Sequence, residues 1–267
     1  MKLADKAIIG NSPVGRVQIL LVSDIHSNLE ALEACLGAAP AFDLAVNLGD
    51  IVGYGASPNE VSARSRELGK HFVRGNHDKA VAGLSDLKDF NPIAGLAALW
   101  TRDQLTTENM DWLRSLPEGP MGIAELPGIQ FVHGSPLDED EYVVTMDDAL
   151  GPLEHSSART IFFGHTHLQG GFYVDDAGNH TVHPQYPSVG KSESSELALQ
   201  PGVHYMINPG SVGQPRDGDW RAAFATFDTE TRSVSFRRVP YDLKSAQERI
   251  VAANLPPRLA TRLAAGK

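Results

Sequence analysis

The sequence lacks features that would place it in several classes of protein. It contains one cysteine, Cys35, so no intramolecular disulfide can form. No apolar run approaches the length of about 18 residues that a membrane-spanning helix requires. The first residues, MKLADKAIIGNSPVGR, also lack the long apolar core of a signal peptide. We therefore expect a cytoplasmic protein without a membrane partner.

Basic residues are too few for an extended nucleic-acid partner. The chain has 23 basic and 33 acidic residues, which gives a formal net charge of −10. A long nucleic-acid track would need a basic face to neutralise phosphates. A small anionic substrate is compatible with this charge, because bound metal ions can reverse the sign of the local field.

The ordering of apolar runs predicts an α/β fold. An unbroken apolar run at 17–23 is typical of a strand buried on both faces, and helical spacing follows at 28–38. The same alternation continues to about residue 78, which favours parallel strand pairing. Further along, we expect a helix over 91–116, strands at 129–133 and 160–164, and a helix near 145–155.

The second half changes character. Short alternating segments such as QGGFYVDD, RAAFATFD and SVSFRRV predict an antiparallel sheet. Between them, 178–201 is polar and broken by proline and glycine, so we expect a surface insertion or flap there. The segment 243–267 predicts a helical tail interrupted by Pro256 and Pro257. At 267 residues the chain fits a single domain spanning 1–267.

Oxygen and nitrogen ligands follow five of the predicted strands, in the stretches LLVSDIHSN, NLGDIVGYG, VRGNHD, FVHGS and FFGHTH. The carboxyl ends of strands in α/β sheets are where successive loops converge to bind ligands. Residues one position apart in an extended chain point to the same side, so Asp24 and His26 can share a centre. His165 and His167 can share a centre or serve two adjacent centres.

This donor set suits a pair of hard or borderline metal ions. It contains carboxylate, imidazole and carboxamide groups and no thiolate, which favours manganese, iron or zinc. Seven ligands exceed one tetrahedral site, and two ions roughly 3.5–4 Å apart are the arrangement used in phosphoryl transfer. Each residue alone has an ordinary explanation as a helix cap or a core histidine. The coincidence of five such motifs, each after an apolar strand, argues for a dinuclear site.

The order DxH, GD, GNHD, HG and GHTH resembles the calcineurin-like metallophosphoesterase superfamily, and the resemblance runs from about residue 17 to 228. The stretches GDIVGYGASPNEV and INPGSVGQPRDGD are similar to a small bacterial and archaeal phosphodiesterase branch that includes diadenosine-tetraphosphatase-like proteins. The resemblance implies a four-layer αββα sandwich of two mixed sheets flanked by helices. One departure is Gly53, which stands where the GDxxD form of the motif has a second acidic residue.

The resemblance also implies a role for each motif residue. His77 contacts the substrate and protonates the leaving group, with Asp78 either orienting it or capping the following turn. Asn28 and Arg74 lie close enough to the ligands in sequence to touch phosphate, although a surface ion pair accounts for Arg74 equally well. The implied ligands are Asp24, His26 and His167 for one ion, Asn76, His133 and His165 for the other, and Asp50 as the bridge.

The sequence therefore predicts a phosphoesterase that uses two divalent ions, with Mn²⁺ preferred and iron or zinc as alternatives. Its substrate is expected to be a small phosphodiester or a dinucleoside polyphosphate. Three alternatives stay open: a phosphomonoesterase acting on small molecules or proteins, a non-catalytic scaffold of the same fold, and a metal-dependent amidohydrolase. An amidohydrolase would normally carry HxH after its first strand, where this chain has DIH. The stretch 211–220 either closes over the substrate or supports the site from behind.

Overall fold

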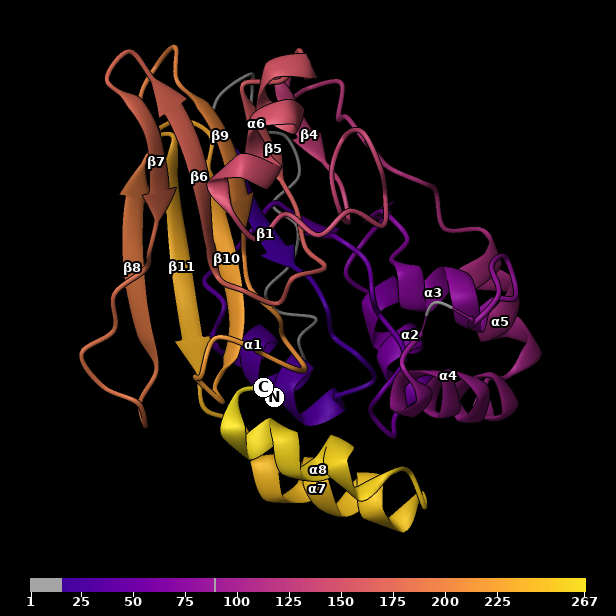
Figure 1. The fold of residues 1–267 in the computed structure, drawn as a ribbon. Helices are drawn as coiled ribbons and strands as arrows, with labels where there is room; N and C mark the ends of the chain where they lie inside the picture. The colour runs from indigo at the N-terminus through magenta and orange to yellow at the C-terminus, as the bar shows by residue number, and fades with distance from the viewer. Residues whose placement is uncertain (1–15, 89) are drawn as a thin grey trace.

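Two β-sheets lie at the centre of the structure, a computed structural model that describes residues 16–88 and 90–267 (Figure 1). The segment 1–15, which we expected not to be a signal peptide, falls outside the described residues. The first sheet contains β1 (Gln18–Val22), β2 (Leu44–Asn47), β3 (His71–Phe72), β8 (Glu193–Ala198), β10 (Ala222–Asp228) and β11 (Ser233–Val239). The second contains β4 (Ile129–Phe131), β5 (Thr160–Phe162), β6 (Gly170–Asp175), β7 (Gly178–Val182) and β9 (His204–Asn208).

Both sheets mix parallel and antiparallel pairs. The first has the order β3-β2-β1-β10-β11-β8, in which β1 runs parallel to β2 and antiparallel to β10. The second has the order β4-β5-β9-β6-β7, in which β5 is parallel to both β4 and β9. The predicted fold class is confirmed: the N-terminal strands pair in parallel, and most later strands pair antiparallel.

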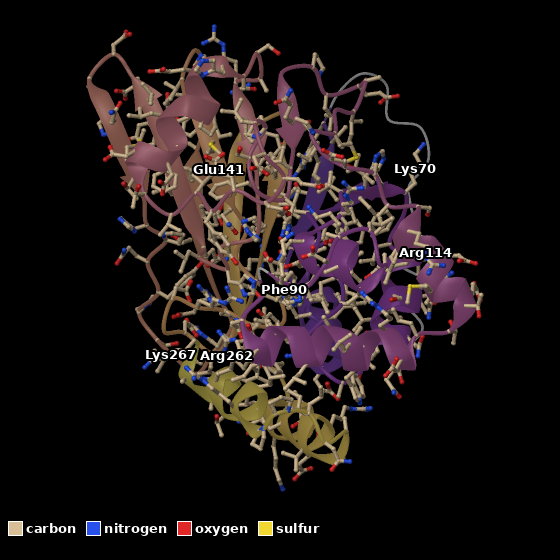
Figure 2. All side chains as sticks on the ribbon, turned by 45° about the vertical axis from the view of Figure 1, so that its right-hand side comes forward. Lys70, Phe90, Arg114, Glu141, Arg262 and Lys267 are labelled. Carbon is tan, nitrogen blue, oxygen red and sulfur yellow. The ribbon has the colours of Figure 1, made fainter. Side chains whose placement is uncertain are left out.

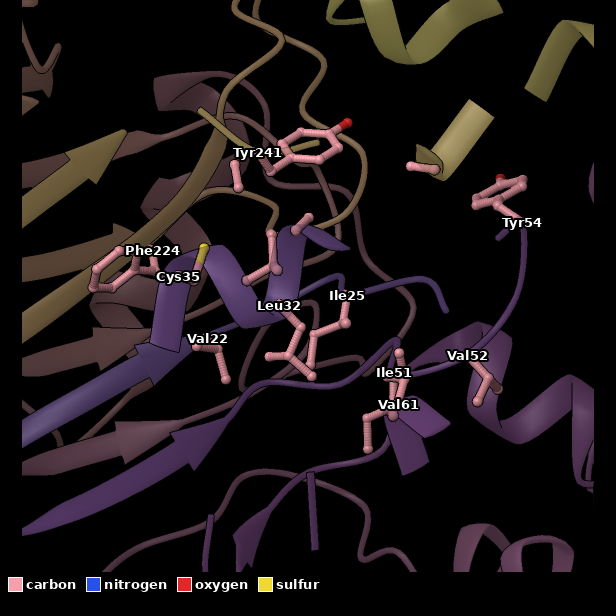
Figure 3. Packing of buried hydrophobic residues seen from close by; sticks show 14 of the residues in the cluster. Val22, Ile25, Leu32, Cys35, Ile51, Val52, Tyr54, Val61, Phe224 and Tyr241 are labelled. Atoms are coloured by element: carbon pink, nitrogen blue, oxygen red, sulfur yellow. The ribbon is translucent and has the colours of Figure 1, made fainter. Parts of the chain in front are cut away.

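Alternation along β1 explains the inner layers. Leu20 and Val22 point to one face and pack with Leu32 and Cys35 of α1 (Leu29–Ala38). Figure 3 shows Val22 beneath Leu32 and Cys35 in this cluster. Ile19 and Leu21 point to the other face and pack against residues of the second sheet. A strand with apolar side chains on both faces must be covered on both. Its sequence, QILLV, supplies that pattern.

The second sheet repeats this arrangement on the opposite side. Phe162 of β5 faces the first sheet, where its ring lies 5.4 Å from that of Phe227. Its neighbours Ile161 and Phe163 pack under α6 (Met146–His155). The layers are therefore helix, sheet, sheet and helix, with α7 (Leu243–Ala252) and α8 (Pro257–Ala265) adding to the first helical layer beside α1.

A group of four helices stands beside the sheets (Figure 1). It comprises α2 (Pro58–Arg66), α3 (Asn76–Val81), α4 (Pro92–Gln104) and α5 (Thr107–Arg114). The helical pattern expected over 91–116 is confirmed, but it forms two helices, α4 and α5. Leu105 leaves the helical conformation with ψ of 133°, and Thr106 caps α5 through a side-chain bond from the Asn109 amide. Thr106 is therefore a start signal inside an otherwise helical pattern.

The expectation of a surface flap at 178–201 is wrong for two parts of that segment. Residues 178–182 form β7 and residues 193–198 form β8, the edge strands of the two sheets. Their polar composition fits edge strands, in which one face and one row of backbone groups remain open to solvent. Near the C-terminus, the helical tail is interrupted as expected: α7 ends at Ala252, Pro256 is the N-cap of α8, and Pro257 is its first residue. Within the described residues, no helix has both the length and the apolar character needed to cross a bilayer.

Candidate metal centre

The seven side chains expected to bind metal follow the strands that the two sheets align. Asp24 and His26 follow β1, Asp50 follows β2, and His133 follows β4. Asn76 is the first residue of α3, directly after the turn that leaves β3. The remaining two, His165 and His167, follow β5. Since β1, β2, β4 and β5 all end at the same side of the molecule, residues as distant as 24 and 167 meet there.

These side chains form two groups that share one carboxylate. Within each group, one potential ligand atom from every residue lies within 4.8 Å of the others. The first group is Asp24, His26, Asp50 and His167, and the second is Asp50, His133 and His165. Asn76 joins the second group, because its Oδ1 lies 3.3 Å from His133 Nε2.

Backbone carbonyls fix the orientation of the imidazoles. The Nδ1 atoms of His26, His133 and His167 lie 3.1, 2.8 and 2.6 Å from the carbonyl oxygens of residues 52, 48 and 214. A carbonyl only accepts, so each Nδ1 carries the proton and each Nε2 presents a lone pair. His165 has the opposite orientation, with Nε2 at 3.1 Å from the Asp140 carbonyl oxygen. In His165 it is therefore Nδ1 that presents the lone pair to an ion.

Two contacts in the first group favour a bound cation. The Nε2 atoms of His26 and His167 lie 3.1 Å apart. With both Nδ1 atoms protonated, two lone pairs face each other. Asp24 Oδ1 is buried without a hydrogen-bond partner and lies 3.3 Å from His167 Nε2. Unpaired buried acceptors are costly, and a divalent ion would satisfy all three.

The electrostatics of the free protein point the same way. Burial raises the pKa of Asp24 to about 7, and it raises the pKa of Asp50 well above the usual range of a carboxyl group. Burial also lowers the pKa of His26, His165 and His167 well below the usual value. The imidazoles are therefore neutral, as metal ligands must be, and the buried carboxyl groups need positive charge to ionise.

Backbone strain is concentrated at the same residues. Positive φ angles occur at Asp24 (53°), His26 (48°), Asp50 (55°), His165 (66°) and His167 (61°). Such conformations cost of order 1–3 kcal/mol each in non-glycine residues and persist where the surroundings enforce them. Asp24 and His26 do belong to one group, as expected. The expected reason, an extended chain, is wrong. Left-handed turns direct them to one group, and a similar turn sends His165 and His167 to different groups.

Close packing leaves no room for side chains at two glycines. A Cβ at Gly75 would lie 2.1 Å from Asp50 Oδ1. At Gly53 it would lie 2.5 Å from His77 Nδ1, and φ at Gly53 is +92°. The sequence departure at position 53 thus has a structural reason: an acidic side chain does not fit between this loop and the His77 ring.

His77 lies in an aromatic cluster beside the metal groups. Its ring centroid is 4.4 Å from that of Tyr54, 4.8 Å from Phe90 and 4.9 Å from His26. Its Nδ1 is buried without a hydrogen-bond partner, and its backbone amide donates to Asp50 Oδ1 at 2.8 Å. Burial, followed by the charge of Arg216, lowers its pKa well below the usual value.

The Asp78 carboxylate holds backbone amides of two loops beside the metal groups. Its carboxylate accepts hydrogen bonds from the amides of Gly75, Ile51 and Val52, at 3.1, 2.9 and 3.1 Å. The first of these caps the start of α3, so Asp78 is a capping residue, but it caps the turn before it and not the turn after it. The other two tie the loop after Asp50 to the loop that carries Asn76.

Arg74 and Asn28, expected near the substrate, are engaged elsewhere. Arg74 donates to both carboxylate oxygens of Glu139 at 2.8 Å and to Glu118 at 2.9 Å, which confirms the ion-pair alternative. Asn28 caps α1 by accepting from the Ala31 amide at 3.1 Å, and its side-chain nitrogen donates to the Gly213 carbonyl at 2.9 Å. Substrate contact by either residue stays a prediction.

Several residues around the site carry no recognisable motif signal. A pocket of about 510 Å³ opens beside Asn76, His77 and His165, and Tyr54, Phe90 and Tyr142 contribute to its walls. The Tyr142 ring lies 3.8 Å from that of His165. Of these residues, only Tyr54 has a local signal, since it follows Asp50 within the same stretch and also adopts a positive φ of 56°.

The loop at 211–220 supports the centre directly. Its amides at Val212 and Gly213 donate to the carbonyls of Ser23 and Asp24, both at 3.0 Å, and the Gln214 carbonyl orients His167. The amide of Arg216 donates to the His167 carbonyl at 3.2 Å. Supporting the site is thus one established role of this loop.

Comparison with known proteins gives consistent matches across nearly the whole chain. A family model described as the calcineurin-like phosphoesterase superfamily domain matches residues 17–232. The uncharacterized protein MJ0912 of Methanocaldococcus jannaschii is 37% identical over 251 residues, covering 93% of this chain and 98% of its own.

Solved structures agree. A metallophosphoesterase from Sphaerobacter thermophilus is 38% identical with a TM-score of 0.79, and the match covers 95% of this chain and all of that one. The hypothetical protein PH1004 of Pyrococcus horikoshii is 21% identical with a TM-score of 0.72, over 94% of this chain and 99% of that one. The second likeness concerns the fold alone.

Proposed function

The chain belongs to the calcineurin-like phosphoesterase superfamily and is a metal-dependent phosphoric ester hydrolase, and we propose that it is a dinuclear phosphodiesterase acting on a small substrate. The observation that carries this proposal is the pair of ligand groups joined by Asp50, with two Nε2 lone pairs facing each other. One carboxylate shared by two groups is what a pair of adjacent ions requires. Mn²⁺ is our first choice, with iron or zinc as alternatives for the same oxygen and nitrogen donors.

The residues divide between the two ions as the groups do. In our proposal Asp24, His26 and His167 hold one ion and Asn76, His133 and His165 hold the other, while Asp50 serves both. Bound divalent ions would supply electrostatic activation of a water nucleophile and would offset charge on the phosphoryl oxygens. The chain's own contribution is to hold neutral imidazoles in fixed tautomers through the carbonyls behind them.

His77 is our candidate for the residue that protonates the leaving oxygen. It lines the pocket beside both groups, and its ring is held between Tyr54 and Phe90. In the free protein its pKa is lowered by burial and by the charge of Arg216, so the ring is neutral. The negative charge of a bound phosphoester would offset Arg216 and favour protonation when a proton is needed. General acid catalysis of this kind contributes about 10²–10⁴-fold.

The pocket favours a diester over a monoester. A phosphodiester carries a second ester group that must be accommodated next to the phosphorus. The space of about 510 Å³ beside the metal groups, with Tyr54, Phe90 and Tyr142 in its walls, provides room and apolar contact for such a group. The substrate we propose is therefore a small phosphodiester or a dinucleoside polyphosphate. We further propose a single domain over 1–267 and a cytoplasmic setting, in which Cys35 remains the buried free thiol of the structure.

The test is hydrolysis of bis-p-nitrophenyl phosphate by metal-stripped protein, with and without added Mn²⁺, alongside p-nitrophenyl phosphate as the monoester. Bound metal is counted in the same samples. The proposal expects two ions per chain and metal-dependent turnover that prefers the diester. Preference for the monoester would make the protein a phosphomonoesterase. Two bound ions without turnover of either compound would make it a scaffold.

A further inference from the structure

Arg216 is a cation beside the metal centre that lacks a carboxylate partner. Its Nε is buried without a hydrogen-bond acceptor, and its guanidinium donates to Gln214 Oε1 at 3.2 Å. Arg74 and Arg221, by contrast, have carboxylate partners: Arg74 pairs with Glu139, and Arg221 pairs with Asp219 at 2.6 Å. Arg232 and Arg237 share with Arg216 a buried Nε that has no acceptor. Within residues 16–88 and 90–267, Arg216 forms no ion pair. A partly buried guanidinium without an anion is costly and needs an explanation.

Arg216 faces the centre and not the solvent alone. Its backbone amide donates to the carbonyl of the ligand His167 at 3.2 Å, which places this residue next to the first ligand group. Its guanidinium carbon lies 5.9 Å from the ring centroid of Tyr54, a residue of the pocket beside the metal groups. An anion bound in that pocket would therefore be within reach of its field.

A second unpaired guanidinium lies against the same tyrosine. The Arg262 guanidinium carbon, from α8, is 5.7 Å from the Tyr54 ring centroid. Arg262 hydrogen-bonds to the Lys267 carbonyl at 2.5 Å and to the Tyr54 side chain, and in the described part of the chain it too has no ion pair. Burial and the charge of Arg216 lower its pKa. Two like charges are thus held close together, which costs free energy that a bound anion would recover.

A second pocket lies next to the pocket beside the metal groups, and Arg262 lines it. Asn91 lines both the pocket beside His77 and a neighbouring pocket of about 750 Å³ that Arg258, Arg262 and Lys267 also line. No acidic side chain is among the described residues of the second pocket, although the chain as a whole carries a net charge of −10. Figure 2 labels Arg262 and Lys267 at the end of α8 and Phe90 above them. The charged side chains of the second pocket are thus all basic, and one of them, Arg262, also contacts Tyr54.

We propose that Tyr54, Arg216 and Arg262 form a subsite for a second phosphoryl group of the substrate, so that preferred substrates carry at least two linked phosphoryl groups. This rests on the proposed function, because the first phosphoryl group is taken to lie at the metal groups. Charge matching argues for a second group: two divalent ions already neutralise the first phosphoryl group, whereas the two guanidinium groups offer two further positive charges. Guanidinium groups bind phosphate oxygens through paired hydrogen bonds, which suits them to this role.

The experiment compares two substrates of the Mn²⁺-loaded protein. Bis-p-nitrophenyl phosphate has one phosphoryl group, and P1,P2-di(adenosine-5′) diphosphate has two that are linked. The measured quantity is the ratio of kcat/KM for the diphosphate to kcat/KM for the monophosphate diester. We expect Arg262→Gln and Arg216→Gln each to lower this ratio about 10- to 100-fold, the range for losing hydrogen bonds to a charged group.

Arg114→Gln is the control, since Arg114 is an exposed arginine at the end of α5 and lines neither of the two pockets. It should leave the ratio within about twofold, as surface substitutions usually do. Equal losses on both substrates in the Arg216 and Arg262 variants would overturn the proposal and assign the arginines to the phosphoryl group at the metals. An unchanged ratio would also overturn it. Arg262→Lys keeps the charge and should restore part of the ratio if the variants fold alike.

Failure of the proposed function is recognised separately. If the wild-type protein hydrolyses neither compound with Mn²⁺, the phosphodiesterase assignment is wrong. The subsite is then judged by calorimetric binding of the dinucleoside diphosphate to the same metal-loaded protein. Binding that weakens in Arg262→Gln but not in Arg114→Gln supports the subsite, and equal binding by both variants overturns it.

Discussion

The metal centre and the neighbouring subsite of Tyr54, Arg216 and Arg262 are held in opposite ways. In the metal centre, each ligand imidazole uses one ring nitrogen for a hydrogen bond to a backbone carbonyl and leaves the other free for an ion. The Nδ1 of His133, for example, is fixed by a backbone carbonyl at 2.8 Å. In the subsite, the two guanidinium groups have few partners and no carboxylate within the described residues. The metal centre is therefore preorganised, whereas in our proposal the subsite completes its interactions only when an anion binds.

This difference suggests a division of labour. Preorganised ligands lower the cost of reorganisation during the reaction and favour a fixed chemistry. Side chains with unsatisfied donors gain most when a complementary ligand arrives, which favours discrimination between substrates. Changes in the metal centre should therefore abolish activity on every substrate. Changes in the subsite should alter which substrate is preferred.

Asp50→Asn is expected to have the largest effect. Asp50 belongs to both ligand groups, and its Oδ1 also accepts the His77 amide at 2.8 Å. The amide cannot supply two anionic oxygens, so turnover should fall by more than about 100-fold, beyond the 10–100-fold cost of changing an outer-shell partner. Activity on both substrates and the number of bound ions are measured, with exposed Asp103→Asn as the control. Near-normal turnover would refute the shared carboxylate.

His77→Ala should lower the rate without removing metal. Its side chain lies beside the ligand groups but belongs to neither. Loss of a general acid should cost about 10²–10⁴-fold on an alkyl ester and less on a nitrophenyl ester, whose leaving group needs less protonation. Metal content and the two rates are compared in one preparation. Loss of bound metal would show instead that His77 is a ligand, and equal losses on both esters would contradict the acid role.

Glu139→Gln tests the outer support of one ligand. Glu139 accepts from Arg74 and Lys79 at 2.8 Å, and the next residue, Asp140, presents its carbonyl to His165. The amide would hold this loop less firmly, so affinity for one of the two ions should fall about 10-fold, the lower range for outer-shell changes. Metal titration measures this, with Glu118→Gln, which contacts Arg74 alone, as the control.

The effect of Glu139→Gln on thermal stability should depend on pH. Burial opposes ionisation of Glu139, but hydrogen bonds from Arg74 and Lys79 outweigh it and hold its pKa below the usual value. A lowered pKa contributes stability that is present above the unfolded value, about 4.3, and is lost as pH falls through the folded value. The difference in Tm between wild type and Glu139→Gln should therefore be present at pH 7 and shrink below about pH 4. A difference that grows in acid would contradict the ion-pair account.

Much of the metal centre could be predicted from sequence because its signals are local. The motif around Asp24 and His26 directly follows a strand that an unbroken apolar run identifies, and the same holds for the histidines after β5. Strand ends then bring the motifs together, since parallel strands align their carboxyl ends. The conformation that aims the side chains was not predictable in this way. It depends on positive φ angles that the surrounding structure enforces.

The subsite gave no comparable signal. Tyr54, Arg216 and Arg262 come from three distant parts of the chain, and an arginine in a loop or on an amphipathic helix is normally a surface residue. Its meaning depends on which partners it lacks, and that can be read only from the folded structure. The polar segment at 178–201 failed for a related reason. Edge strands tolerate polar residues, so its composition resembles that of a loop.

Asn28→Ala should have the smallest effect and sharpens the boundary between support and substrate contact. Asn28 is 5% exposed, caps α1 through Ala31, and donates to the Gly213 carbonyl. Losing the cap should cost about 1 kcal/mol. Because both polar atoms already have partners, KM and kcat should change little. Thermal unfolding and steady-state kinetics are measured together with Asn28→Ser, which retains a capping oxygen. A higher KM at an unchanged Tm would mean that Asn28 contacts the substrate and does more than support the metal centre.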